Sequence, residues 1–87
     1  MEDRQTRLKR MGIRSWRRGT KEMDLILGPF SDGPLAELPP ADVDAYEALL
    51  EEQDQDLYLW VSGRLTAPEG HLPTLDLIRR FHGINPG

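Results

Sequence analysis

The sequence contains no cysteine, and its 87 residues include only two each of Trp, Tyr and Phe. The absence of cysteine excludes a disulfide framework and a thiolate metal site, and it suits a reducing cytosol. No apolar run is long enough to span a membrane, because Asp24 and Gly28 interrupt the best candidate, residues 23–30. The first residues lack the apolar segment of a secretory signal. We therefore expect one small domain near the lower size limit for a single apolar core.

The sequence also lacks the common patterns of catalytic and metal sites. His71 and His82 are the only histidines, and their spacing does not form an i, i+4 metal pair, so a solvated or helix-capping role is favoured. No phosphate-binding glycine loop, nucleophile elbow or paired-carboxylate site is recognisable. The acidic run at residues 51–56 lacks the spacing of a calcium loop. We predict that the protein is not an enzyme and has neither catalytic nor metal-binding residues.

Charge is distributed unevenly along the chain. Residues 1–22 contain eight Lys and Arg against three Asp and Glu, a net charge of +5. Residues 23–87 contain three against twelve, a net charge of −9. Such asymmetry favours electrostatic steering toward a charged partner. The alternative is that the basic and acidic faces neutralise each other within the fold or are simply solvated.

Apolar spacing and capping residues predict an all-α fold, a small single-domain bundle of about five short helices. The first helix is expected to begin after Asp3 as N-cap and to run up to Gly19. The second covers residues 23–30, where the pair Gly28-Pro29 should kink or end it, and residues 31–34 should form a turn. We assign residues 1–87 to one domain, with residues 1–6 frayed and residues 83–87 as a tail.

Three further helices complete the predicted bundle. One begins near Pro40, one is capped by Asp54 and ends at Gly63, and the last covers about residues 72–82 and ends at Gly83. The loop before the last helix covers residues 66–70. Trp16 suits either the core or an interface. The other residues predicted to face the core are Leu8, Met11, Met23, Ile26, Leu27, Phe30, Val43, Tyr46, Leu49, Leu50, Leu57, Tyr58, Trp60, Val61, Leu75, Ile78 and Phe81.

Five residues, Arg18-Gly19-Thr20-Lys21-Glu22, join the basic first helix to the apolar second helix. Gly19 can adopt the left-handed conformation that ends a helix, with Arg17 and Arg18 in the last turn, where cations complement the helix dipole. If Gly19 also caps the second helix, the Glu22 carboxylate can reach back to its amide, as in half of a capping box. Helix capping explains every residue of the pattern except the choice of arginine at position 18, which is expected at the exposed end of the basic helix.

The same residues also carry a resemblance to a known family. Arg17 precedes Arg18-Gly19-x-x-Glu22, and Met23-Asp24-Leu25, Pro29-Phe30 and the run from Asp54 to Trp60 follow it. This order, spacing and length resemble the bacterial succinate dehydrogenase flavinylation (FAD assembly) factors and their eukaryotic relatives of the succinate dehydrogenase assembly factor 2 type. The resemblance covers roughly residues 8–82.

The resemblance implies a cytoplasmic bacterial assembly factor, or chaperone, that binds the flavoprotein subunit of succinate dehydrogenase or of fumarate reductase. It would promote covalent attachment of FAD to that partner. A helical bundle of this size has little room to enclose a dinucleotide, so we expect no tightly held cofactor, the FAD being that of the partner. Neither a membrane nor a nucleic acid is expected as a partner.

Within that interpretation the helix joint contacts the partner. Gly19, without a side chain, lets the joint approach closely, and Arg18 offers a planar multi-donor fork to partner carboxylates or carbonyls. Glu22 pairs with a partner cation or holds Arg18 in its rotamer. The predicted partner-binding residues are Arg17, Arg18, Gly19, Lys21, Glu22 and Asp24.

Two alternative functions stay open at this point. Some members of the family that this sequence resembles are described as antitoxins of a toxin–antitoxin pair. A small nucleic-acid-binding protein would use the Arg-rich first helix along phosphates, although the overall charge of −4 argues against it.

Overall fold

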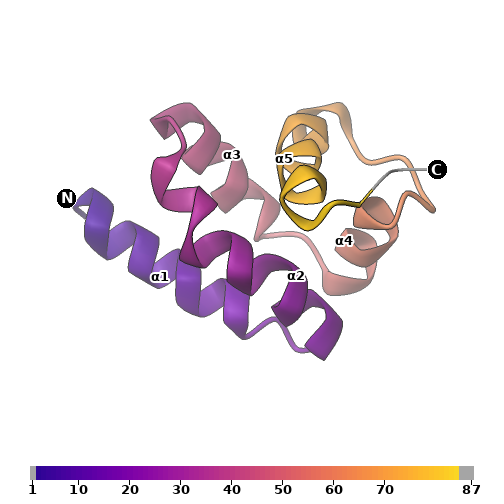
Figure 1. Ribbon diagram of the computed structural model, residues 1–87, viewed down its shortest axis with the longest axis horizontal. Coiled ribbons are helices and arrows are strands. Elements are labelled where there is room, and N and C mark those ends of the chain that lie inside the picture. Colours follow the sequence, from indigo (N-terminus) through magenta and orange to yellow (C-terminus); the bar gives the residue numbers. More distant parts are fainter. Residues whose placement is uncertain (1, 85–87) are drawn as a thin grey trace.

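The computed structural model describes residues 2–84, and within them the chain forms five α-helices and two short 3₁₀ segments (Figure 1). The α-helices are α1 (Arg4–Trp16), α2 (Lys21–Asp32), α3 (Pro40–Leu49), α4 (Asp54–Val61) and α5 (Leu72–His82). The 3₁₀ segments are η1 (Pro34–Glu37) and η2 (Glu69–His71). Residues 2–84 contain no strand, so the predicted all-α bundle of about five helices is confirmed.

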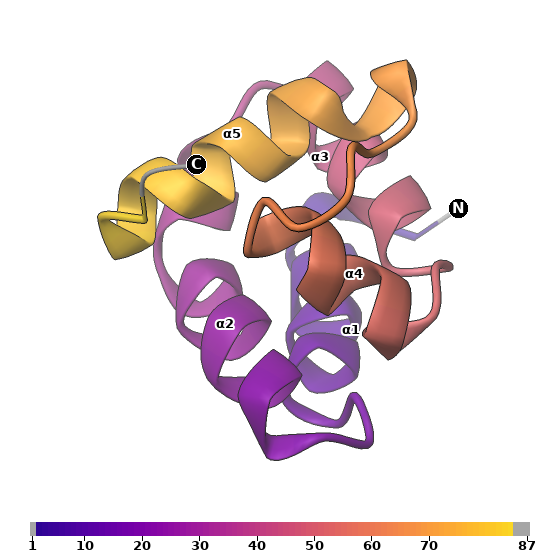
Figure 2. The same cartoon turned by 90° about the vertical axis from the view of Figure 1, so that its right-hand side faces the viewer.

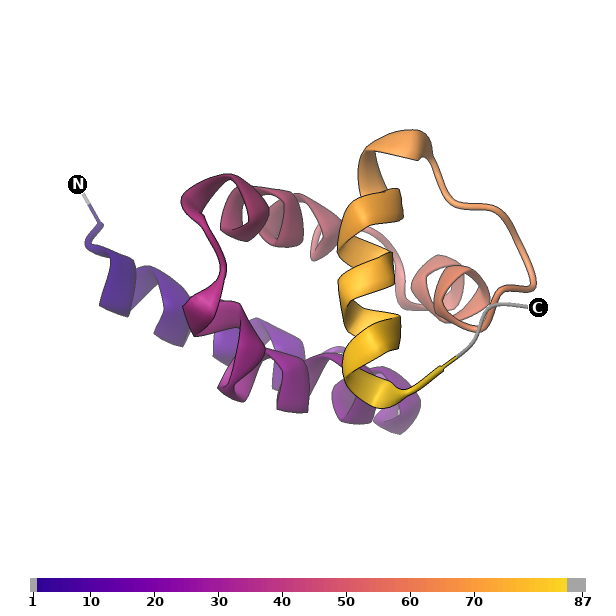
Figure 3. The same ribbon diagram turned by 45° about the horizontal axis from the view of Figure 1, so that its top comes forward.

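The helices form two groups around one core. α1 and α2 lie side by side along the long axis of the molecule (Figure 1). α5 packs against α2, α3 and α4, and Figures 2 and 3 show it crossing between α3 and α4. The molecule measures 39 × 24 × 21 Å. No helix within the described residues is long and apolar enough to cross a membrane.

Apolar residues from all five α-helices fill the core. Most of the predicted positions are confirmed, because the i, i+3, i+4 stripes of α2 to α5 point toward the same centre. The buried apolar residues are Met11, Met23, Leu27, Phe30, Leu35, Val43, Tyr46, Leu49, Leu50, Leu57, Trp60, Val61, Ala67, Leu75 and Ile78. Burial raises the pKa of Tyr46 to about 12, and its hydroxyl shares a 2.7 Å hydrogen bond with the buried Ser15 hydroxyl.

Two residues predicted for the core lie at the surface. Tyr58 is 38% exposed and Phe81 is 45% exposed. Leu57, Trp60 and Val61 already form the i, i+3, i+4 stripe of α4, and Tyr58 falls beside it. Phe81 extends past the buried stripe of α5 and makes edge-to-face contacts with Phe30 and His82, at 5.9 and 4.9 Å between ring centroids.

The second helix is longer than predicted. α2 runs through Gly28-Pro29 to Asp32, although an internal proline removes a backbone donor and costs about 3 kcal/mol. Packing against α1 compensates, because the Trp16 ring lies directly on Gly28. Trp16 is 40% exposed, and its Nε1 donates to Asp32 Oδ1 at 3.0 Å. The turn predicted at residues 31–34 is therefore partly helix, and η1 begins at Pro34.

The ends of the described chain follow the predicted capping. Asp3 caps α1, where its Oδ1 accepts the Thr6 amide at 2.7 Å. Gly83 ends α5 in the left-handed conformation, with φ of +70°. The assignment of residues 1–87 to one domain and the fraying of residues 1–6 stay predictions. Residues 85–87 of the predicted tail lie outside the described residues.

Gly28 and Gly12 offer a matched test of the α1–α2 contact. A Cβ added to Gly28 would lie 2.4 Å from Trp16 ring carbons, whereas one added to Gly12 would lie 3.9 Å from its nearest neighbour, Ser31 Oγ. We expect Gly28→Ala to lower the free energy of unfolding by about 1–2 kcal/mol. Gly12→Ala should raise it by about 0.5–1 kcal/mol through helix propensity. Urea denaturation measures both, and equal stabilisation by the two variants would contradict this packing.

Candidate partner-binding site

The joint between α1 and α2 is a four-residue bend. α1 ends at Trp16, with Arg17 as C-cap, so Arg17 and Arg18 do not lie in its last turn as predicted. Gly19 has φ of +107°, a conformation that favours glycine, and an added Cβ would lie 3.4 Å from Asp54 Oδ2. The predicted left-handed glycine is confirmed, but it turns the bend rather than ending the helix directly.

Arg18 is held by the chain itself. Its Nε donates to Asp54 Oδ1 at 2.7 Å, Nη1 to the Leu50 carbonyl at 2.7 Å, and Nη2 to the Glu52 carbonyl at 2.6 Å. The side chain is 10% exposed, and that of Asp54 is 15% exposed. Leu50 and Glu52 follow α3, while Asp54 begins α4. One guanidinium thus ties the α1–α2 joint to the turn between α3 and α4; we call these contacts the Arg18 clamp.

The prediction that Arg18 sits at an exposed helix end is wrong. The carbonyls after α3 have no partner within that helix, and a planar fork can satisfy two of them together with a carboxylate. The backbone amide of Arg18 is held as well, because it donates to Asp24 Oδ1 at 2.7 Å. Asp54, predicted as an N-cap, is instead the first residue of α4 after Gln53, and its carboxylate holds Arg18.

Glu22 shows the opposite behaviour. The N-cap of α2 is Thr20, whose hydroxyl accepts the Met23 amide at 3.3 Å, so the predicted capping box between Gly19 and Glu22 is wrong. Glu22 occupies the first turn of α2 with its side chain exposed. Within residues 2–84 it has no hydrogen bond or ion pair through its carboxylate, and so it does not hold Arg18. Its negative charge suits the helix N-terminus but leaves the carboxylate open to a partner.

A surface hollow lies beside Glu22. Its volume is about 430 Å³, and it opens between the N-terminal ends of α2 and α4. The lining residues are Thr20, Glu22, Asp54, Gln55, Tyr58 and Leu59. The sequence analysis did not predict Gln55 and Tyr58 as site residues. The position of Tyr58 beside the apolar stripe of α4 could have indicated that its side chain lies at the surface. Of the predicted site residues, Arg18 and Asp24 are brought into contact, while Arg17 and Lys21 are exposed.

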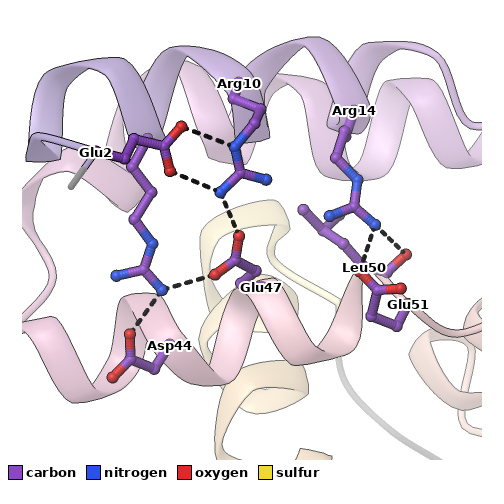
Figure 4. A network of polar contacts seen from close by, with 8 residues as sticks. Glu2, Arg10, Arg14, Asp44, Glu47, Leu50 and Glu51 are labelled. Atoms are coloured by element: carbon purple, nitrogen blue, oxygen red, sulfur yellow. Dashed lines mark hydrogen bonds and ion pairs between the residues drawn. The ribbon is translucent and has the colours of Figure 1, made fainter.

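The basic face of α1 is matched by acidic residues of α3. Arg7 pairs with Asp44 at 2.6 Å and with Glu47 at 2.9 Å. Figure 4 shows Arg10 bridging Glu2 and Glu47, at 3.0 and 2.6 Å. The charge asymmetry of the sequence is therefore in good part neutralised within the fold.

Further along α1 the same pattern continues. Arg14 pairs with Glu51 at 2.8 Å (Figure 4), and the Arg18 clamp follows in the bend after the helix. These four arginines at positions 7, 10, 14 and 18 would have been the phosphate contacts of a nucleic-acid-binding helix. Their carboxylate partners would compete with phosphates. Residues 2–84 also contain no group of three His, Cys, Asp or Glu residues that could hold a metal ion.

Comparison with known proteins places this chain in a family. A family model described as "Flavinator of succinate dehydrogenase" matches residues 9–82, which include the whole helix joint and the Arg18 clamp. The chain belongs to this family. The sequence-based resemblance is therefore confirmed. No solved structure matches the chain.

Several curated relatives are similar to this chain. It is 37% identical over 67 residues to "Succinate dehydrogenase assembly factor 2, mitochondrial" of Mycosarcoma maydis, covering 77% of this chain and 28% of that protein. The protein of that name in Schizosaccharomyces pombe is 37% identical over 68 residues, 78% of this chain and 49% of that protein. "FAD assembly factor SdhE" of Aliivibrio fischeri is 45% identical over 47 residues, 54% of this chain and 55% of that protein. The chain thus spans about a quarter to about half the length of these relatives.

The Arg18 clamp predicts a strong dependence of stability on the guanidinium. Arg18→Lys keeps the charge but cannot reach two carbonyls and a carboxylate together, so we expect a loss of about 3 kcal/mol in the free energy of unfolding. Arg17→Lys, at the exposed neighbour, should change it by less than about 0.5 kcal/mol. Urea denaturation of the two variants measures the difference, and an Arg18→Lys protein as stable as the parent would refute the clamp.

The α1–α3 ion pairs predict acid sensitivity. Hydrogen bonds from Arg10 and Arg7 hold the pKa of Glu47 below its ordinary value of 4.5. The stabilisation is therefore complete above pH 4.5 and is lost as the pH falls through the lower pKa of the folded state. Unfolding free energies measured between about pH 6 and pH 2.5 should fall less steeply in Glu47→Gln than in the parent. A parallel pH profile in the two proteins would show that Glu47 contributes nothing.

Proposed function

We propose that this chain binds the flavoprotein subunit of succinate dehydrogenase and promotes covalent attachment of its FAD. The observation that carries the proposal is the family match over residues 9–82. Relatives named for succinate dehydrogenase assembly and for FAD assembly support it. None of the relatives named above is called an antitoxin, and the engaged arginines of α1 disfavour nucleic acid.

The chemistry belongs to the flavoprotein. A C–N bond forms between a partner histidine and the 8α carbon of FAD while a C–H bond of that carbon breaks. The protons from that carbon and from the imidazole nitrogen pass to bases or to the flavin, and two electrons remain in the flavin ring, which is thereby reduced. The helper supplies no nucleophile. Holding the imidazole against the flavin methyl lowers the barrier by several kcal/mol, and a docked helper favours that arrangement by shifting the flavoprotein's conformational equilibrium.

The helix joint has two layers in this proposal. The Arg18 clamp is the inner layer, which fixes the bend and positions the residues around it. Gly19 and Glu22 form the outer layer that meets the flavoprotein, and the open carboxylate of Glu22 pairs with a partner cation. Lys21 and Arg17 add exposed charge beside them, while Asp24 supports the bend through the Arg18 amide.

Several narrower statements belong to the same proposal. The flavoprotein subunit of fumarate reductase is a second client. The protein acts as an assembly factor rather than an enzyme, holds no FAD tightly by itself, and works in the bacterial cytoplasm. The bacterial relatives from Aliivibrio fischeri and Vibrio cholerae support this setting.

The test is to express the flavoprotein subunit with and without this chain in bacterial cells that lack a homologue. Covalent flavin is scored by in-gel fluorescence after denaturation. We expect the fluorescent band to increase several-fold when the chain is present. Equal fluorescence in both cultures would overturn the proposal.

Charge reversal at Glu22 separates docking from folding. Glu22→Lys should abolish most of the gain in covalent flavin while lowering the free energy of unfolding by only about 1 kcal/mol, because its carboxylate favours the N-terminus of α2 but has no partner within residues 2–84. Glu69→Lys makes the same charge change at another exposed position and should keep full activity. Equal flavinylation by the two variants would remove Glu22 from the docking surface.

A further inference from the structure

α1 has two charged faces, and only one of them is neutralised. Arg7, Arg10 and Arg14 point toward α3 and are held by its carboxylates and those just beyond it. Lys9 lies outside that face of α1, and Arg17 is the C-cap residue just after the helix; both are exposed. Neither forms an ion pair within the described residues 2–84. The unpaired cations are eight residues apart, or about 12 Å along the helix.

Apolar side chains lie between these two cations. Ile13 is 51% exposed and Trp16 is 40% exposed, and their spacing places both on the same side of α1 as Lys9. A hollow of about 530 Å³ runs along this side between α1, the end of α2 and η1. Its lining residues are Leu8, Lys9, Gly12, Ile13, Trp16, Arg17, Ser31, Asp32 and Ala36. We call this hollow the α1–α2 groove.

Two features keep the α1–α2 groove rigid and open. The Trp16 ring packs against Gly28, and its Nε1 donates a hydrogen bond to Asp32. These two contacts hold the aromatic wall of the groove in place. Gly12 of α1 lines the groove and has no side chain to fill it. A Cβ added to Gly12 would lie 3.9 Å from its nearest neighbour, Ser31 Oγ. A preformed surface of this kind loses little conformational entropy on binding.

We propose that the α1–α2 groove is a second docking surface, which binds an acidic segment of the client flavoprotein. The proposal rests on the proposed function. Charge complementarity favours this occupant: two cations at the ends of an apolar strip fit a peptide segment with carboxylates about 12 Å apart and an apolar side chain between them. The one carboxylate of the lining, Asp32, accepts the Trp16 Nε1 hydrogen bond, and the two cations outnumber it. The apolar centre favours a protein segment over a nucleic acid, whose contacts would be phosphates along a continuous row of cations.

The experiment measures the affinity of the purified chain for the purified flavoprotein subunit at several salt concentrations. Lys9→Glu and Arg17→Glu should each weaken binding about fivefold at low salt and reduce the salt dependence. Ile13→Ser should weaken binding about fivefold without changing the salt dependence. Arg64→Glu is the matched control, because it reverses another exposed cation away from the groove.

The outcomes separate this inference from the proposed function. If the parent chain does not bind the flavoprotein, both fall. If it binds and raises covalent flavin, but Lys9→Glu and Ile13→Ser, whose residues line only the groove, match Arg64→Glu, only the groove is overturned. The groove proposal would also be overturned if the groove variants abolished binding to a random-sequence oligonucleotide while flavoprotein binding persisted. It would be overturned as well if the variants abolished a dimer of this chain detected by sedimentation. Unfolding curves equal to that of the parent confirm that each variant is folded.

Discussion

The Arg18 clamp is the contact on which the arrangement of the helices depends. A single side chain from the α1–α2 joint satisfies the Leu50 and Glu52 carbonyls beyond α3 and pairs with Asp54 at the start of α4. A charge that is 10% exposed is tolerated only when it is fully paired, and here every side-chain partner comes from the turn between α3 and α4. Arg79 plays a related part at the end of α4, where it donates to the carbonyls of Trp60 and Val61. Both arginines donate hydrogen bonds to backbone carbonyls at or just after the C-terminal end of a helix, which water would otherwise have to satisfy.

The clamp changes the meaning of the Arg-Gly-x-x-Glu pattern. The sequence suggests that capping explains Gly19 and Glu22 and leaves Arg18 unexplained. In the structure the reverse holds for the two charged residues, because the fold uses Arg18 completely and leaves the Glu22 carboxylate without an intrachain partner. A binding surface needs both kinds of residue. Contact residues can discriminate between partners only if the backbone that carries them is held in place.

Helical periodicity predicted the fold well and the site only in part. The starts of α3 and α5 and most core positions follow from local spacing and capping, which a single sequence displays directly. The contact of the Trp16 ring with Gly28 could not be predicted, because it depends on how closely α1 and α2 approach each other. This contact supports the continuation of α2 through Pro29. The partner of Arg18 was equally hidden, since Asp54 is one of several acids at residues 51–56 and lies 36 positions away. Long-range pairing of charges is a property of the tertiary structure.

The division of α1 into two charged faces follows from the same packing. Because α3 lies along one side of α1, its acids pair with Arg7 and Arg10, and Glu51 just beyond α3 pairs with Arg14. Lys9 and Arg17 stay exposed, without an ion pair within residues 2–84. Neutralisation within the fold and electrostatic steering are therefore not competing explanations for the basic N-terminal segment. The first stabilises the packing of α1, and the second can act through the exposed cations without an ion pair in residues 2–84, Lys9, Arg17 and Lys21. If the α1–α2 groove binds the partner as proposed, recognition on this side uses a short amphipathic strip rather than a whole basic helix.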